Sequence, residues 1–238
     1  MWDFYDRLID LVPKDLTVDR ITVGDTWTFV AAEDLRGIAV TVNEQERILP
    51  SFSKYRGVSL KEVAALCKSW NFVEASVGTA ALNAYLNTRN RLKEVGAEET
   101  IGGFHDYKKI AAGKKVAIIG HFFQLERFLT ESSVYVLERS PEPGDYPDPA
   151  CEYLLPEMDY TFITGSSFIN KTLPRLLLLC RHPIILGPST PMCDLLFSYG
   201  AKELSGLSLH KTSPEDELFA ARGGIRTSAL GTRYRLIP

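Results

Sequence analysis

The sequence has 238 residues, of which 45% are apolar and 24% are charged, and this composition is typical of a soluble globular protein. A formal net charge of -3 provides no basic field to attract nucleic acid or an anionic membrane, so neither is an expected partner. The acidic, aromatic start of the chain is unlike a signal peptide, and the longest apolar run, Leu176–Cys180, is too short to span a bilayer. A cytoplasmic protein is therefore expected.

The cysteines are scattered through the chain and contain no C-x-x-C pair. This pattern argues against a disulfide scaffold and against a structural zinc ribbon. Their positions are Cys67, Cys151, Cys180 and Cys193.

The first half of the chain predicts a small α+β domain over residues 1–100. Apolar residues at helical spacing predict a helix over 2–11, and alternation predicts three short strands within 18–23, 27–31 and 38–42. Ser59 and Glu62 form a capping-box pattern for a helix to about residue 70, and a second helix is expected over 72–91. The charged and glycine-containing stretch 94–112 is the expected linker.

The second half alternates strands with helices. Strands are expected at 116–120, 134–138, 160–164, 183–186 and 206–210, and helices at 122–129, 173–181, 191–199 and after Ser213. A Pro- and Gly-rich loop over 140–149 is placed to cover a cleft. This alternation predicts a parallel sheet with right-handed crossovers, a Rossmann-like domain over residues 110–238.

Two of these strands end on a glycine followed by hydroxyl residues. Ligands of open parallel sheets bind outside the carboxyl ends of the strands, so both loops are expected to form one polar cleft. Asn83, on the helix of the first domain, is expected to contribute from the opposite side. The candidate ligand-binding residues from the strand ends are Thr164, Gly165, Ser166, Asn170, Thr172, Gly187, Ser189 and Thr190.

A metal site is a second hypothesis for the same cleft. Ser189 and Thr190 precede Pro191 in a pattern typical of a helix amino terminus, which attracts anions but is also an ordinary cap. Cys193 would then lie in the first turn, where the helix dipole lowers the pKa of a thiol. Together with His121, which follows the first parallel strand, and with Glu138 and Asp194 nearby, such a thiolate would suit a transition or heavy metal ion.

The first strand-to-helix turn, Gly120-His121-Phe122, is compared with a dinucleotide-binding turn. It has one glycine, and Phe122 stands where a small residue would let a pyrophosphate approach, so NAD and FAD are not expected. Glu138 ends the next strand and is either a ligand-binding acid or a structural residue.

Motifs in order along the chain carry a family resemblance. They are Gly78-Thr79-Ala80-Ala81-Leu82-Asn83-Ala84, Val116-Ala117-Ile118-Ile119-Gly120, Glu138 with Pro141 and Gly144, Ile163-Thr164-Gly165 with Asn170-Lys171-Thr172, and Gly187-Pro188-Ser189-Thr190-Pro191 with Gly200 and Leu204-Ser205-Gly206. The first motif resembles the DUF4213 domain. The others resemble the DUF364 family, whose members are described as heavy-metal chelation proteins. The resemblance implies an enolase amino-terminal-like domain packed on a Rossmann-like domain, with a ligand site between them.

The leading hypothesis is a protein that binds a metal ion, a metal chelate or a small anionic ligand in the interdomain cleft. The alternatives are an enzyme acting on a phosphate- or carboxylate-bearing metabolite, with His121 or Glu138 as general base, and a nucleotide-binding regulatory module. The reaction, if any, and the oligomeric state, a homo-oligomer included, are left open by the sequence.

Overall fold

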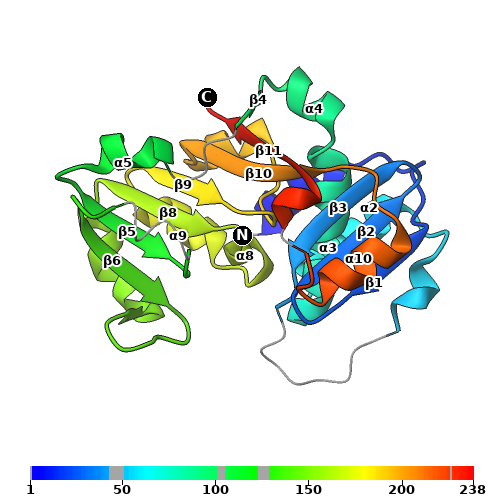
Figure 1. Cartoon of the computed structure of the whole chain (residues 1–238), viewed down its shortest axis with the longest axis horizontal. Helices are drawn as coiled ribbons and strands as arrows, with labels where there is room; N and C mark the ends of the chain where they lie inside the picture. Colours follow the sequence, from blue (N-terminus) through cyan, green and yellow to red (C-terminus); the bar gives the residue numbers. More distant parts are fainter. Residues whose placement is uncertain (1, 43–50, 101–104, 123–128, 226) are drawn as a thin grey trace.

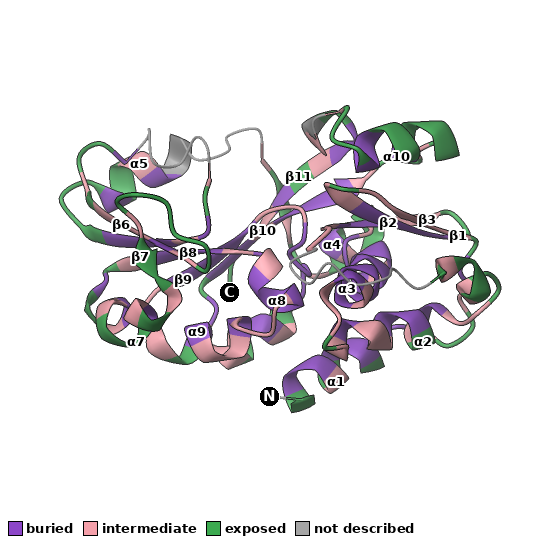
Figure 2. Cartoon of the chain, turned by 90° about the horizontal axis from the view of Figure 1, so that it is seen from below, coloured by how far each residue is buried: buried purple, intermediate pink, exposed green. Residues whose placement is uncertain are grey.

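A computed structural model describes residues 2–42, 51–100, 105–122, 129–225 and 227–238. The described chain forms two sheets, a three-stranded antiparallel sheet and a larger, mainly parallel one, which lie beside each other in Figure 1. Buried residues occupy both sheets and the helices between them (Figure 2). No helix in the described ranges is long and apolar enough to cross a membrane.

The antiparallel sheet is built from the first part of the chain. Its strands follow the order β1 (Arg20–Val23), β2 (Trp27–Ala32) and β3 (Leu35–Val40). The surrounding helices are α1 (Trp2–Asp10), η1 (Phe52–Tyr55), α2 (Leu60–Ala64), η2 (Ala65–Lys68), α3 (Phe72–Leu86) and α4 (Arg89–Glu94).

Helix α3 lies at very short range from β3 on one side and from η2 on another, because a glycine stands at each contact. A Cβ on Gly37 of β3 would lie 2.0 Å from the carbonyl oxygen of Ala80, and one on Gly78 of α3 would lie 1.9 Å from the amide nitrogen of Cys67. The side chain of Asn71 caps α3 by accepting from the amides of Val73 and Glu74. Glycines at these contacts therefore allow α3 to pack closely against its neighbours.

The larger sheet has eight strands in the order β4-β11-β10-β9-β8-β5-β6-β7. From β10 to β7 the neighbouring strands are parallel, whereas β11 pairs antiparallel with both β10 and β4. The strands are β4 (Glu98–Glu99), β5 (Lys115–Ile119), β6 (Ser133–Glu138), β7 (Tyr146–Pro147), β8 (Tyr160–Thr164), β9 (Pro183–Leu186), β10 (Glu203–Leu209) and β11 (Gly231–Leu236).

Helices cover both faces of the parallel part. Tyr107 and Ala111 of α5 pack with Val116, Ile118 and Phe162 on one face, and α8 and α9 pack on the other. The helices of this part are α5 (His105–Ala111), η3 (Asp148–Ala150), α7 (Cys151–Leu154), η4 (Leu155–Glu157), α8 (Ser166–Ile169), α9 (Leu173–Leu179), η5 (Asp194–Tyr199), α10 (Pro214–Ala221) and η6 (Thr227–Ala229). The order β7-β6-β5-β8-β9-β10 is the 3-2-1-4-5-6 order of a Rossmann sheet, so the expected fold class is confirmed.

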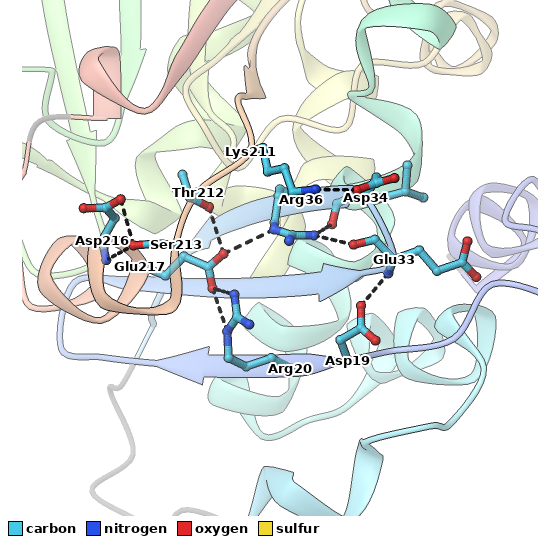
Figure 3. A network of polar contacts seen from close by, with 11 residues as sticks. Asp19, Arg20, Glu33, Asp34, Arg36, Lys211, Thr212, Ser213, Asp216 and Glu217 are labelled. Atoms are coloured by element: carbon cyan, nitrogen blue, oxygen red, sulfur yellow. Dashed lines mark hydrogen bonds and ion pairs between the residues drawn. The ribbon is translucent and has the colours of Figure 1, made fainter.

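Helix α10 links the two sheets, because it follows β10 of the large sheet and packs on β1 and β2 of the small one (Figure 1). Glu217 on α10 is 1% exposed and is held from three sides (Figure 3). Its carboxylate accepts from Nη2 of Arg20 at 2.8 Å and from the hydroxyl of Thr212 at 2.8 Å, and it lies 3.5 Å from Nε of Arg36. Since a buried carboxylate is costly unless it is paired, these partners fix where α10 sits.

Several predicted boundaries were wrong. The hydroxyl of Ser59 does not cap α2 but donates to the carbonyl of Lys14, and α2 is short and continues as the 3-10 helix η2. The expected helix over 72–91 breaks at Asn87 into α3 and α4. Strand β10 begins three residues earlier than expected, and β4 and β11 were missed.

Other expectations concern segments between the strands. The predicted helix over 122–129 falls largely on residues 123–128, and the linker over 94–112 includes 101–104; both stretches lie outside the described residues. The described ends of that linker contain β4 and α5. The proline-rich loop over 140–149 contains the edge strand β7. The division into domains 1–100 and 110–238 stays a prediction.

Candidate functional site

A cavity of about 390 Å³ lies at the carboxyl ends of β5, β6 and β8. These strand ends flank the topological switch point of the sheet. From β5 the chain adds β6 on one side, and then returns to add β8 on the other side. Ligands of open α/β sheets bind in the crevice at this point. The lining residues are Val42, Ile119, Gly120, His121, Leu137, Glu138, Arg139, Ser140, Asp148, Cys151, Thr164, Ser166, Ser167, Asn170 and Thr172.

Gly120 directly follows β5, and its backbone lies close to the neighbouring strand β8. Its φ of +90° is a conformation that side chains disfavour, and a Cβ there would lie 2.9 Å from Cγ2 of Thr164. Glu138 ends β6, and its Oε2 accepts from the amide of Arg139 at 2.9 Å. Its Oε1 lies 3.8 Å from the position a Cβ would take on Gly120, so the carboxylate reaches across the end of β5.

Hydroxyl groups line the wall of the cavity beside β8. The hydroxyls of Thr164 and Ser166 lie 3.1 Å apart, and the hydroxyl of Ser167 donates to the carbonyl of Thr164. Oδ1 of Asn170 accepts from both the amide and the hydroxyl of Thr172, which closes the turn between α8 and α9. This wall offers groups that both donate and accept hydrogen bonds.

His121 lies at the mouth of the cavity and is paired with an acid. Its Nε2 is 2.9 Å from Oδ2 of Asp145, which also accepts from the amide of Glu142. The Glu142 amide, followed by His121, holds the pKa of Asp145 below its ordinary value. Asp145 thus orients the imidazole of His121.

Two cations flank one aromatic ring near this cavity. The guanidinium of Arg139 lies 5.4 Å and the ammonium of Lys171 lies 5.9 Å from the ring centre of Phe72, the first residue of α3. Lys171 has a φ of +69°, and its Nζ donates to the carbonyl of Ile169. Burial lowers the pKa of Lys171 to about 8. The cluster places positive charge between the two sheets.

A second cavity of about 490 Å³ adjoins the first, because Val42, Thr164 and Ser166 line both. It opens at the carboxyl end of β9 and is closed by β2 and β3 of the small sheet. Its lining residues are Trp27, Val40, Thr41, Val42, Phe122, Thr164, Gly165, Ser166, Leu186, Gly187, Pro188 and Ser189. The second cavity is more aromatic and apolar than the first.

The arrangement of a small α+β unit before a Rossmann-like sheet agrees with the sequence relatives. Residues 104–235 match the profile of the DUF364 family, described as "Putative heavy-metal chelation". The chain belongs to the DUF364 family. Residues 5–86 match the DUF4213 profile, which carries the same description.

Solved DUF364 structures share this fold over their whole length. A protein with unknown function from Desulfitobacterium hafniense is 35% identical, with a TM-score of 0.91 over 100% of this chain and 99% of that one. A Pyrococcus horikoshii protein is 23% identical, with a TM-score of 0.81 over 99% and 98% of the two chains, which shows the fold alone. The uncharacterized protein MJ0500 of Methanocaldococcus jannaschii is 34% identical over 151 residues, 58% of this chain and 56% of that protein.

In this DUF364 protein, the predicted site residues fall into four groups. His121, Glu138, Asn170 and Thr172 line the first cavity, Thr164 and Ser166 line both, and Gly165, Gly187 and Ser189 line the second. Asn83, Thr190 and Cys193 line neither cavity.

Two of the residues that line neither cavity, Asn83 and Thr190, lie where the two parts of the molecule are held together. Nδ2 of Asn83 donates to the carbonyl of Ile38 at 2.9 Å and to that of Pro188 at 3.4 Å. The side chain of Asn83 therefore reaches the segment after β9, but it is buried and its hydrogen bonds join two parts of the protein. Thr190 is fully buried, and its carbonyl accepts from Nδ2 of Asn87. Ser189 shares in this junction, since its Oγ accepts from the amide of Val40 at 2.8 Å.

The predicted helix amino terminus after β9 was wrong. Regular structure begins at Asp194 with the 3-10 helix η5, and neither Ser189 nor Thr190 caps it. Cys193 is 1% exposed, and burial raises the pKa of its thiol to about 11, opposite to the expected direction. The dipole argument failed because burial raises the pKa of the Cys193 thiol by more than the backbone amide of Leu195, in the first turn of η5, lowers it.

The residues present do not fit a bare metal ion. Within the described ranges, no three His, Cys, Asp or Glu side chains are grouped to hold one. Cys151 lines the first cavity, but burial raises the pKa of its thiol to about 11, which disfavours the thiolate that binds metals. Of the two predicted metal ligands, His121 and Cys193, only His121 lines the cavity.

Sequence reasoning missed lining residues of two kinds. Arg139 and Ser140 directly follow Glu138 and were detectable as further residues at the carboxyl end of a strand. Trp27 and the segment 40–42 approach from the antiparallel sheet, and nothing in their local sequence marks them as site residues.

Proposed function

We propose that this protein binds a small organic ligand, free or as the chelator of a metal ion, across the two joined cavities. The observation that carries the proposal is the continuous cleft over four strand ends, with hydroxyl and carboxylate groups in one part and aromatic groups in the other. Pockets that combine an apolar surface with a few convergent polar groups are typical of small-molecule sites.

The donor set favours an organic partner over a bare ion. Burial disfavours the thiolate of Cys151, and Cys193, the thiol predicted to bind a metal together with His121, lines neither cavity. Thr164 and Ser166 offer hydroxyls, which are weak ligands for soft metals but good partners for the polar groups of an organic molecule. The family description of heavy-metal chelation agrees with these side chains if the atoms that chelate the metal belong to the organic ligand and not to the protein.

An enzyme acting on a phosphate- or carboxylate-bearing metabolite is the second candidate. It is favoured by Arg139, which lines the first cavity, and by Lys171 on the same Phe72 ring. Both cations would attract an anionic group of the ligand.

The test is native mass spectrometry with elemental analysis on protein purified without chelators or an affinity metal. Thr164→Val removes a hydroxyl shared by both cavities, and Thr22→Val on β1 is the matched control, since Thr22 lines neither. An organic mass retained by the wild type and the control but lost from Thr164→Val supports the proposal. One bare metal ion per chain without an organic mass contradicts it.

Protein that emerges empty is screened by thermal shift against free divalent metals, organic chelators and the metal–chelator complexes. Ligands that bind only the folded state raise its stability by mass action. Stabilisation by a chelator or its complex, reduced in Thr164→Val, supports the proposal. Stabilisation by free metals alone, or by none of these probes, contradicts it.

A further inference from the structure

The first cavity has the layout of a site for a vicinal diol. Glu138 follows Gly120 by about 20 residues and ends the strand next to β5, which is where Rossmann sheets place an acid that accepts from ribose hydroxyls. A carboxylate only accepts hydrogen bonds, and its two oxygens suit two neighbouring hydroxyl donors. The position along the chain and the position in the sheet point to the same role.

The carboxylate of Glu138 is also held in the orientation that this role needs. The Arg139 amide fixes Oε2, while Oε1 leans over Gly120, whose lack of a side chain leaves the end of β5 open. Leu137 and Ile119, directly before these two residues, add apolar surface to the same cavity. A ring carrying two hydroxyls can therefore approach the ends of β5 and β6 together.

The cavity is also lined by residues that follow β6 in the chain. Ser140 lies in the segment after β6, Asp148 begins η3 and Cys151 begins α7, and all three line this cavity. The carboxylate of Asp148 is held by the guanidinium of Arg175 at 3.1 Å. A flat heterocyclic base beyond the diol would meet an apolar surface at Cys151 and polar edge groups at Ser140 and Asp148.

A pyrophosphate does not fit the same turn. His121 and Phe122 follow Gly120, so the small residues that let a dinucleotide approach the backbone are missing. The second cavity begins instead at Thr164 and Ser166 and is lined by Trp27, Phe122 and Leu186. The part of a ligand that points from the diol toward β8 would enter this aromatic compartment.

We infer that the first cavity binds a ribonucleoside, with the 2′ and 3′ hydroxyls on Glu138 and the 5′ carbon toward the second cavity. The inference rests on the proposed function, because it names the class of organic ligand for that same cleft. It excludes dinucleotides as the preferred ligands and assigns Glu138 as the residue that distinguishes a ribose from a deoxygenated sugar.

The experiment measures affinity by isothermal titration calorimetry for adenosine and uridine and for their 2′,3′-dideoxy counterparts. The variants are Glu138→Gln, which keeps size but replaces an acceptor oxygen by a donor, and Glu157→Gln, an exposed control outside both cavities. We expect at least one ribonucleoside to bind about tenfold or more tightly than its dideoxy form. Without the two hydroxyls of the ligand, the carboxylate oxygens of Glu138 lose their hydrogen-bond donors. Glu138→Gln should abolish that preference, and Glu157→Gln should keep it.

Equal binding of ribo and dideoxy forms, or an unchanged preference in Glu138→Gln, overturns the inference. The failure of the inference is separable from that of the proposed function by competition with the organic ligand found by mass spectrometry or thermal shift. If that ligand binds in a Thr164-dependent way and neither nucleoside binds or displaces it, the inference fails and the proposed function stands. If no organic ligand binds at all, both fail.

Discussion

Replacement of Asn87 by alanine tests whether the junction between the two sheets is fixed by buried side-chain hydrogen bonds. Asn87 is 2% exposed at the carboxyl end of α3. Its Nδ2 donates to the carbonyls of Thr190 and Leu207 at 3.0 and 3.3 Å, and its Oδ1 accepts from the amide of Met192 at 2.8 Å. All three partners belong to the segment that follows β9 or to β10.

Removal of these three hydrogen bonds, at about 1–1.5 kcal/mol each, lowers the free energy of unfolding by roughly 3–5 kcal/mol. For a chain of this size that loss lowers the melting temperature by roughly 6–20 °C. The measurements are urea denaturation followed by circular dichroism and a calorimetric melt.

Asn90→Ala is the matched control, because Asn90 is exposed on the neighbouring helix α4. The control should change stability by less than about 0.5 kcal/mol, as surface substitutions usually do. If Asn87→Ala is no more destabilising than Asn90→Ala, the buried tie does not hold the junction and the reasoning is refuted.

Three further results are expected. Gly78→Ala should lower the free energy of unfolding by about 1–3 kcal/mol in chemical denaturation, because the Cβ would strike the backbone of Cys67; a gain from helix propensity would contradict the packing. Cys193 should resist iodoacetamide at pH 8 in the folded protein, as read by peptide mass spectrometry, because its thiol is buried with a pKa near 11; rapid labelling contradicts this. For Lys171, burial favours the neutral amine, so between about pH 8 and the ordinary lysine pKa of 10.5 the unfolded chain binds more protons than the folded one. The free energy of unfolding of the wild type, relative to that of Lys171→Met, should therefore rise with pH across that window. A difference that stays flat or falls would contradict this prediction.

The fold could be predicted in outline because its signals are local. The strands β5, β8 and β9 are buried on both faces and read as continuous apolar runs between turn residues. Ser213 and Pro214 mark the start of α10, and the hydroxyl of Ser213 does accept from the amide of Asp216. Alternation of such strands with helices is enough to predict a parallel sheet.

Only the part of the candidate site that is formed by the strand ends of the parallel sheet could be predicted. Glu138, Thr164 and Ser166 line a cavity because any residue at the carboxyl edge of neighbouring parallel strands is brought to the same place. Trp27 and the segment 40–42 could not be found in this way, since their nearness to β8 and β9 depends on how two sheets pack.

Ser189 and Cys193 show why a local pattern can mislead. A hydroxyl before a proline is a good helix cap in isolation, yet the amide of Val40, far away in the sequence, hydrogen-bonds Ser189, and the helix begins later. Although η5 begins directly after Cys193, burial governs the thiol of Cys193 and raises its pKa.

The sequence by itself determined the class of fold and the edge of the sheet at which ligands gather, because apolar periodicity and strand ends are properties of neighbouring residues. The tertiary structure alone decided which polar groups are left to face a ligand. Asn83, Asn87 and Ser189 are polar residues whose hydrogen bonds are used to join the two sheets. Buried polar groups must be paired, so the packing of distant segments, which no local pattern encodes, selects the side chains that stay available for binding.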